Sequence, residues 1–318
     1  MELFHNANID WLGRKWYFLG FSLIFSVAGL ISMGLHLAHT GSPVPLGVDF
    51  RGGTQVLVQF QNDPDVNQIR KATEAAGVNA KIVNYDTPDK REMLISLPEQ
   101  SDASVDSGRK QIVDALQAHY ANHATVVRVE SVGPTVGQQL EKQAGLATLY
   151  SLIGMLIYLW FRFELIYGVA AVVAVFHDTL ITVGFFALFD KEVSLTVIAA
   201  ILTLVGYSMN DTIVVFDRIR ENLRLSRRES LTDVVNRSIN QTLSRTVLTS
   251  GLTFLTVLAL YLFGGEVLRG FSFALVVGIL IGTYSSIAVA APMLVAYQGW
   301  RGSKGKAAVL PSAKRSKA

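Results

Sequence analysis

The sequence predicts a polytopic α-helical membrane protein with six transmembrane helices and one small α+β domain between the first two. Half of its 318 residues are hydrophobic. They gather into six blocks of roughly 20 residues, the length of a helix that crosses about 30 Å of hydrocarbon. A mixed stretch of about 100 residues after the first block is long enough to fold alone. The six blocks are Trp16–Ala38, Gly145–Phe161, Leu165–Phe189, Val193–Phe216, Val247–Phe263 and Gly270–Tyr297.

The first block resembles a signal peptide, because Arg14 and Lys15 precede it. It is longer than a signal core, and no small-residue cleavage site follows it at Leu37-Ala38-His39. We therefore expect this block to be retained as the first membrane span.

Basic residues predict the orientation of the spans. Arginines and lysines precede the first block, join the second to the third, follow the fourth and fill the tail, whereas the opposite short loops hold Lys191 and Arg269. Short basic loops stay in the cytoplasm. We therefore expect a multi-pass protein of the cell inner (cytoplasmic) membrane. Its expected parts are a cytoplasmic N-terminus at 1–15, a first span at 16–38, an exported domain at 39–142, five spans in 143–297 with a cytoplasmic loop at 218–243, and a basic cytoplasmic tail at 298–318.

The exported domain reads as β-α-β-β-α-β. Periodicity and turn residues predict, in order, a strand at Thr54–Phe60, a helix at Asp65–Ala76 stopped by Gly77, a hairpin of Lys81–Tyr85 and Glu92–Leu97 around residues 87–90, a helix at Val105–Tyr120 and a strand at Thr125–Val132. This order is the ferredoxin-like, split βαβ arrangement. Because that fold hosts many functions, it indicates none by itself.

The residues of this domain give little indication of an enzyme active site. The chain has no cysteine, which excludes disulfides and thiolate metal sites. His119 and His123 have no carboxylate pair at ligand spacing, so surface or capping roles are favoured. The run Gly47–Gly53 leads into a strand, whereas a phosphate loop leads into a helix. We interpret it as a tight turn with positive-φ glycines and a capping Asp49, and we expect no enzyme activity, cofactor or metal.

The strongest functional signal is the polar run Ser208-Met209-Asn210-Asp211-Thr212 inside the fourth block. A carboxylate in hydrocarbon costs several kcal/mol, so it usually faces a bundle interior and serves transport or proton relay. Ser208 and Thr212 share one helix face with Asp211.

Further polar residues surround this position in the predicted bundle. Arg245 enters the fifth span at a depth comparable with Asp211. A stripe of threonines follows at spacings of three or four: Thr242, Thr246, Thr249, Thr253 and Thr256. Asp211 and Arg245 form either a proton relay or a static buried pair that fixes helix register. Further relay or interhelical supports are Asn210, Ser208, Thr246, Thr249, Asp178 and His177. Gly278 and Gly282 form a small-xxx-small pattern that predicts close helix packing.

Three motifs carry a family resemblance. They are Gly47-Val48-Asp49-Phe50-Arg51-Gly52-Gly53-Thr54, the run from Ser208 to Asn222, and Arg237-Ser238-Ile239-Asn240-Gln241-Thr242-Leu243-Ser244-Arg245-Thr246. In sequence and order they resemble the SecF side of the SecD/SecF protein-export family, within the resistance-nodulation-division (RND) superfamily. The resemblance covers nearly the whole chain, except for the tail after Trp300.

The resemblance implies a transport role. Its members pair with a SecD-like subunit, associate with the SecYEG channel, and use the proton motive force to pull preproteins through after the SecA motor has acted. The positions of Asp211 and Arg245 belong to the family's proton pathway. On this interpretation, protonation of Asp211 weakens its pairing with Arg245, lets helices shift and moves the exported domain.

Two alternatives remain open from the sequence. An RND-type exporter of small molecules or lipids would use a similar aspartate, but it typically needs larger exported domains. A non-transporting assembly scaffold would use the polar residues for interhelical contact alone. The arginines after Asp217 are explained by cytoplasmic retention and contact with anionic lipid head groups, so we expect a lipid bilayer partner and no nucleic acid.

Overall fold

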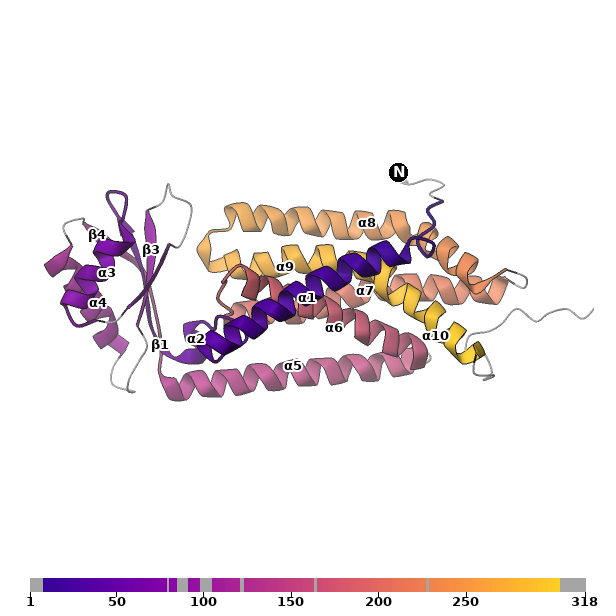
Figure 1. Cartoon of the computed structure of the whole chain (residues 1–318), viewed down its shortest axis with the longest axis horizontal. Helices are drawn as coiled ribbons and strands as arrows, with labels where there is room; N and C mark the ends of the chain where they lie inside the picture. Colours follow the sequence, from indigo (N-terminus) through magenta and orange to yellow (C-terminus); the bar gives the residue numbers. More distant parts are fainter. Residues whose placement is uncertain are drawn as a thin grey trace, which may run out of the picture. The chain divides into compact units, whose positions relative to one another are not determined.

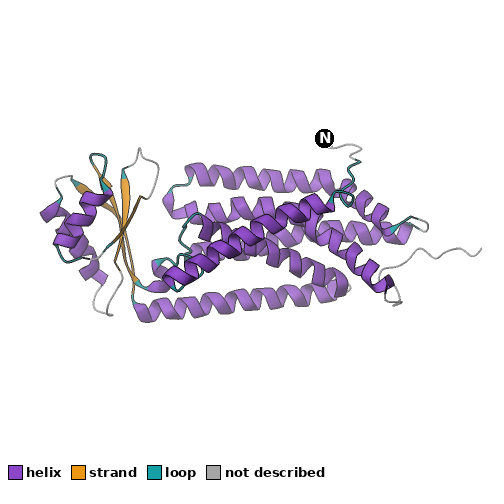
Figure 2. Cartoon of the chain, viewed as in Figure 1, coloured by secondary structure: helices purple, strands orange, loops and turns teal. Residues whose placement is uncertain are grey.

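The computed structural model describes residues 8–78, 80–84, 91–97, 105–120, 123–162, 165–226 and 229–303. The chain divides into two compact units. The helical unit comprises Met1–Pro45, Thr148–Lys191 and Thr196–Ala318, and the sheet domain comprises Leu46–Ala147 and Glu192–Leu195. Figures 1 and 2 show the elements of each unit.

Long helices make up the helical unit. They are α1 (Lys15–Thr40), α5 (Pro134–Arg162), α6 (Leu165–Leu188), α7 (Leu195–Leu225), α8 (Leu231–Phe263), and α9 (Glu266–Ser285) followed by the π-helical turn η2 (Ser286–Ala290) and α10 (Ala291–Ser303). Within the described residues, five helical stretches are long and apolar enough to cross a membrane: Lys15–Thr40, Ile166–Leu188, Leu195–Leu225, Leu231–Phe263 and Val267–Tyr297. They match five of the six predicted blocks. The remaining block, Gly145–Phe161, lies inside α5.

The segment 218–243 was predicted as a cytoplasmic loop between two membrane spans. Helix α7 continues to Leu225 and α8 begins at Leu231, so most of this segment is helical. The physical reason is a second apolar face, which continues beyond the predicted spans. Ile219, Val235 and Ile239 are fully buried in the core of the helical unit. Burial of such side chains stabilises a helix more than its intrinsic propensity does.

Small residues set the closest helix contacts in this unit. A Cβ atom on Gly184 of α6 would lie 2.7 Å from the Cα atom of Gly29 on α1. A Cβ atom on Gly282 would lie 3.0 Å from the Cβ atom of Ser208, and one on Gly278 would meet the side chain of Leu204. The predicted small-xxx-small pattern therefore works as packing, and it brings α9 against α7.

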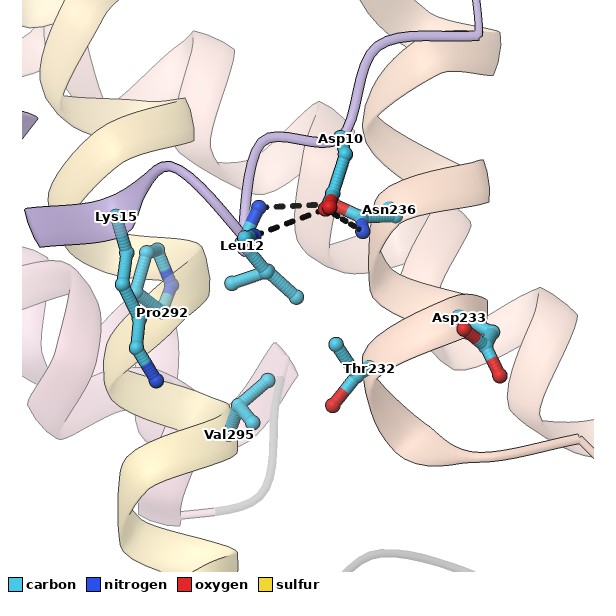
Figure 3. Close-up of a pocket in the computed structure, with 9 residues that line it drawn as sticks. Asp10, Leu12, Lys15, Thr232, Asp233, Asn236, Pro292 and Val295 are labelled. Atoms are coloured by element: carbon cyan, nitrogen blue, oxygen red, sulfur yellow. Dashed lines mark hydrogen bonds between the residues drawn. The ribbon is translucent and has the colours of Figure 1, made fainter.

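The segment before α1 is hydrogen-bonded to the first turns of α8. The backbone N–H of Leu12 donates to Asn236, 3.0 Å away, and Asn236 in turn donates to Asp10 over 2.7 Å (Figure 3). The backbone N–H of Gly13 and the side chain of Asn236 hold the pKa of Asp10 below its ordinary value. A lowered carboxylate pKa means that this docking is fully present at neutral pH and is lost only as acid protonates Asp10.

The sheet domain contains one antiparallel sheet with strand order β2-β3-β1-β4. Its elements are α2 (Val48–Arg51), β1 (Gly53–Phe60), α3 (Val66–Ala75), β2 (Lys81–Asn84), β3 (Glu92–Leu97), α4 (Val105–His119) and β4 (Ala124–Val132). Each predicted strand and helix is present. The predicted hairpin turn at residues 87–90 lies outside the described residues.

The local signals in this domain act as predicted. The Asp65 side chain accepts a hydrogen bond from the Asn67 N–H and so caps α3. Gly77 ends that helix with φ 72°, Gly52 takes φ 72° directly before β1, and Gly53, its first residue, takes φ 122°. These backbone conformations favour glycine. The core between sheet and helices is apolar, with Val56, Ile69, Met93, Ile95 and Ile112 fully buried.

Contact between α1 and α6 predicts a position-specific effect of an added methyl group. Gly184→Ala should destabilise the protein by about 1–3 kcal/mol, because the Gly29 backbone cannot yield to the methyl group as a flexible side chain could. Thermal unfolding in detergent measures this. Gly34→Ala on α1 is the matched control, since a Cβ there meets nothing within 4 Å. Equal unfolding temperatures for the two variants would contradict the packing described here.

Candidate functional site

Asp211 is buried in the helical unit, as its place in the sequence predicted. It lies on α7 with 2% of its surface exposed. The Ser250 hydroxyl of α8 donates to its Oδ2 atom over 2.6 Å. The Thr283 side chain of α9 also faces the carboxylate, but its hydroxyl gives its hydrogen to the carbonyl of Ile279, 2.8 Å away. Asp211 therefore keeps unused acceptor capacity in a buried position.

Arg245 was predicted to lie at a depth comparable with Asp211 and to pair with it. Its side chain is exposed on α8, five residues before Ser250. Among the described residues no ion pair joins it to Asp211, whose carboxylate accepts a hydrogen bond from Ser250.

The threonine stripe of α8 is not a chain of hydrogen bonds across the bundle. The hydroxyls of Thr242, Thr249, Thr253 and Thr256 each donate to the carbonyl four residues earlier in their own helix. This is the usual arrangement for threonine inside a helix. The Thr246 hydroxyl differs, because it is buried and has no hydrogen-bond partner among the described residues. Thr246 is one turn before Ser250 and on the same face.

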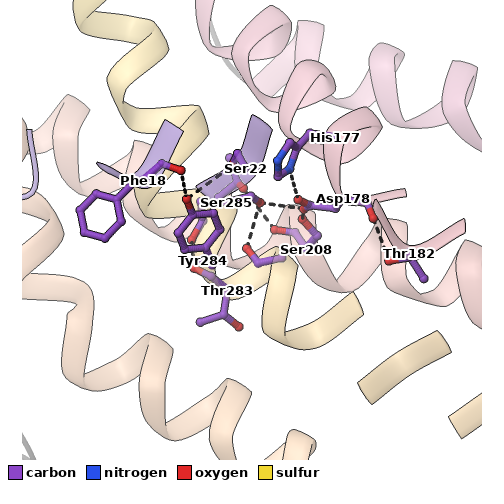
Figure 4. A network of polar contacts seen from close by, with 12 residues as sticks. Phe18, Ser22, His177, Asp178, Thr182, Ser208, Thr283, Tyr284 and Ser285 are labelled. Carbon is purple, nitrogen blue, oxygen red and sulfur yellow. Dashed lines mark hydrogen bonds and ion pairs between the residues drawn. The ribbon is translucent and has the colours of Figure 1, made fainter. Parts of the chain in front are cut away.

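Asp178 lies at the centre of a second polar cluster, drawn in Figure 4. It is on α6 and is 1% exposed. The Ser208 hydroxyl of α7 donates to its Oδ2 atom over 2.5 Å, and the Ser285 hydroxyl of α9 donates to the same atom over 2.7 Å. His177 Nδ1 lies 2.9 Å from its Oδ1 atom. With a proton on Nδ1, the imidazole is the third donor.

The two carboxylates therefore have different environments. Three side chains on three helices hold Asp178, which suits a structural role. Among the described residues, Asp211 accepts a hydrogen bond from Ser250 and has the Thr283 side chain nearby, which leaves it less firmly held than Asp178. The sequence analysis left His177 and Asp178 open between support and relay, and this geometry favours support. Ser208 belongs with Asp178, and Asn210 is exposed on α7.

The last turn of α9 contacts both clusters. Thr283 faces Asp211, and Ser285 binds Asp178. Tyr284, between them, accepts a hydrogen bond from Ser22 of α1 over 3.3 Å and donates to the Phe18 carbonyl (Figure 4). The π-turn η2 begins directly afterwards, at Ser286. Such turns occur frequently at functional sites, because they interrupt the regular helix.

The sequence analysis missed Ser250, Thr283 and Ser285. Serine and threonine are common in membrane helices, so composition does not distinguish a hydroxyl that meets a carboxylate. Spacing could have indicated Ser250, because Thr242, Thr246 and Ser250 follow one another at intervals of four and share a face. Ser285 had no comparable signal, since its role depends on how α9 packs on α6.

The arrangement can bind and release a proton inside a helical bundle. Within the described part of the chain, no group of three or more histidine, cysteine, aspartate or glutamate side chains could hold a metal ion. Asp217, farther along α7, lies 2.8 Å from the Arg162 guanidinium. It is exposed, unlike Asp178 and Asp211.

A bundle of long apolar helices with buried carboxylates, joined to a small sheet domain, defines a polytopic membrane protein of the transporter class. Residues 112–300 match the family model described as protein export membrane protein SecD/SecF, C-terminal, and residues 40–64 match the SecD/SecF GG motif. The chain belongs to the SecD/SecF family of protein-export membrane proteins.

Its relatives agree along almost their full length. The chain is 54% identical to a protein translocase subunit SecF from Koribacter versatilis, covering 97% of this chain and 96% of that protein. It is 44% identical to the protein of the same name from Desulfurispirillum indicum, with 90% and 91% covered.

Two solved structures are similar in fold. The crystal structure of SecDF, a translocon-associated membrane protein from Thermus thermophilus, aligns with a TM-score of 0.82 at 39% identity. SecDF in a super-membrane-facing form aligns with a TM-score of 0.67 at 38% identity. The chain is covered to 94% and 95%, but it spans only 40% of each SecDF chain.

The unequal hydrogen bonding of the two carboxylates predicts unequal stability effects. Asp178→Ala leaves Ser208, Ser285 and His177 without their acceptor, whereas Asp211→Ala frees Ser250 alone. Buried donors left unpaired cost about 1–3 kcal/mol each. Chemical or thermal unfolding in detergent should therefore find Asp178→Ala less stable than Asp211→Ala by about 2 kcal/mol or more. If Asp211→Ala were instead the less stable variant, Asp211 would be the carboxylate that stabilises the helix packing.

Proposed function

We propose that the chain is a SecF subunit that drives preprotein translocation with the proton motive force, and that Asp211 carries the proton. The observation that carries this proposal is the Asp211 carboxylate, which is 2% exposed and accepts a hydrogen bond from Ser250 but has acceptor capacity left. The names of the relatives support the transport role.

The proton step follows from the hydrogen-bond chemistry of the site. A protonated Asp211 gains a donor, and the Thr283 oxygen that faces it can accept that hydrogen. Protonation also removes the attraction between the carboxylate and the Arg245 charge. Both changes act on helices that contact Asp211, namely α8 and the last turn of α9. Each proton that crosses supplies about 2.3 kcal/mol per 100 mV, which biases a conformational equilibrium more than tenfold.

A SecD-like partner would complete the pathway. Asn210 and Arg245 are exposed in the single chain, on helices that are otherwise apolar enough to span a membrane. A guanidinium and an amide that face lipid are costly. We propose that the partner subunit covers this face and that Arg245 moves toward Asp211 when the partner binds or when the proton leaves.

The wider arrangement follows from the charge pattern and the family. We propose six spans in the inner membrane, with both termini in the cytoplasm. The apolar part of α5 is the second span in chain order. The sheet domain is then exported, and its strand order β2-β3-β1-β4 supports a ferredoxin-like fold. SecYEG, SecA and the translocating preprotein are the partners that this role implies.

Preprotein export into inverted membrane vesicles, with and without a proton gradient, tests the role of Asp211. In vesicles that contain the chain and its SecD-like partner, we expect Asp211→Asn to remove the acceleration that the gradient gives. Export in the absence of a gradient should stay near the wild-type rate, because the Ser250 hydroxyl still finds an acceptor in the asparagine side chain.

Asp217→Asn is the matched control. It makes the same charge change on the same helix, six residues away, at an exposed carboxylate that pairs with Arg162. We expect this variant to respond to the gradient as the wild type does. A normal gradient response in Asp211→Asn would exclude the proposed relay and favour the scaffold or exporter alternative.

A further inference from the structure

The proton-bearing helix α7 begins inside the sheet domain. Its first residue, Leu195, and the three residues before it belong to that domain, although they follow β4 by about 60 residues in the sequence. The sequence analysis assigned only residues 39–142 to the exported part. Residues 192–195, which include the start of the predicted span Val193–Phe216, are therefore part of the sheet domain.

The motif Gly47–Gly53 is what holds this segment. The Asp49 carboxylate accepts a hydrogen bond from the backbone N–H of Leu195 over 2.8 Å. The Gly47 N–H donates to the Val193 carbonyl over 2.9 Å, and Leu46 forms a parallel bridge with Val193. The fit at Gly47 is tight, because a Cβ atom there would lie 3.3 Å from the Val193 oxygen.

A second set of contacts fixes the same segment to the sheet. Glu192 accepts a hydrogen bond from the Gln55 side chain over 2.9 Å, and its other oxygen lies 3.7 Å from the Lys81 ammonium group. Gln55 is on β1 and Lys81 on β2. Side chains from two strands and the motif together hold all of 192–195.

The same motif packs closely against the start of α5. A Cβ atom on Gly137 would lie 2.9 Å from the Phe50 carbonyl and 3.1 Å from the Gly52 nitrogen. A Cβ atom on Gly52 would lie 3.0 Å from Pro134, the first residue of α5. The motif is therefore in close backbone contact with one helix and in hydrogen-bond contact with the other.

We propose that Asp49 is a positioning residue that couples the sheet domain to the proton-bearing helix, by capping α7 at Leu195. The first N–H groups of a helix have no partner within the helix, and a carboxylate there also favours the positive end of the helix dipole. Asp49 supplies this cap from a distant part of the sequence. Asp211 lies sixteen residues farther along α7, or about 24 Å at the 1.5 Å rise of an α-helix. A shift of α7 that follows protonation is then transmitted to the sheet domain through Leu195. This inference rests on the proposed function of Asp211.

Two variants of Asp49 separate coupling from charge. Asp49→Ala removes the acceptor, whereas Asp49→Asn keeps an oxygen that caps about as well. We expect Asp49→Ala to increase amide hydrogen exchange in the first turn of α7 about fivefold, the factor that corresponds to the ~1 kcal/mol of a helix cap. We also expect it to lose most of the proton-gradient acceleration of export. Asp49→Asn should restore both properties.

Asp65→Ala is the matched control, because it removes a helix cap of the same chemistry from α3 in the same domain. It should leave the exchange of α7 and the gradient response unchanged. The measurement uses the full chain with its SecD-like partner in inverted vesicles. If Asp49→Ala does not accumulate, Glu192→Ala loosens the same segment and should reduce the acceleration by at least half.

The results distinguish this inference from the proposed function. Loss of acceleration in Asp211→Asn together with full acceleration in Asp49→Ala, despite faster exchange at α7, would overturn the coupling role and leave the relay intact. Full acceleration in Asp211→Asn would overturn the relay itself. Equal loss in Asp49→Ala and Asp65→Ala would also overturn the coupling, since it would reduce the effect to a general weakening of the domain.

Discussion

The hydrogen bonds to Asp178 are the constraint on which the helical unit depends. A carboxylate at 1% exposure is tolerated only where donors replace its hydration. Here α7 and α9 each contribute a serine, and α6 contributes the adjacent histidine. Because Ser208 lies three residues before Asp211, the register that Asp178 imposes on α7 also fixes where Asp211 faces. The hydrogen bonds of one buried carboxyl group therefore orient the second.

The end of α9 contacts both carboxyl groups directly before an irregular helical turn. Thr283 and Ser285 lie two residues apart and face different carboxylates, and the helix leaves its regular geometry immediately afterwards in η2. A change of proton occupancy at Asp211 alters what Thr283 meets, while Ser285 stays fixed by Asp178. The cap on α7 at Leu195 then places the same helix in contact with the sheet domain. Asp211 and the Asp49 cap at Leu195 therefore belong to one continuous helix.

The sequence predicted the elements better than their contacts. Hydrophobic blocks and turn residues located the strands, the helices and the isolated carboxylate Asp211, because these depend on local composition. The helical extensions of α7 and α8 were missed, since their apolar faces are stabilised by tertiary burial. The roles of Ser250 and Ser285 also escaped prediction, because a hydroxyl on a helix carries no sign of which neighbour it will meet. Asp49 was expected to cap a turn nearby, and its actual partner lies 146 residues away.

Infrared difference spectroscopy of the reconstituted complex tests the central claim most directly. A pH change should produce the carbonyl stretching band of a protonated carboxyl group if a buried aspartate takes up the proton. We expect this band in the wild type and in Asp178→Asn, and we expect it to be absent in Asp211→Asn. Loss of the band in Asp178→Asn with its persistence in Asp211→Asn would contradict the proposed relay, because the proton would then reside on Asp178.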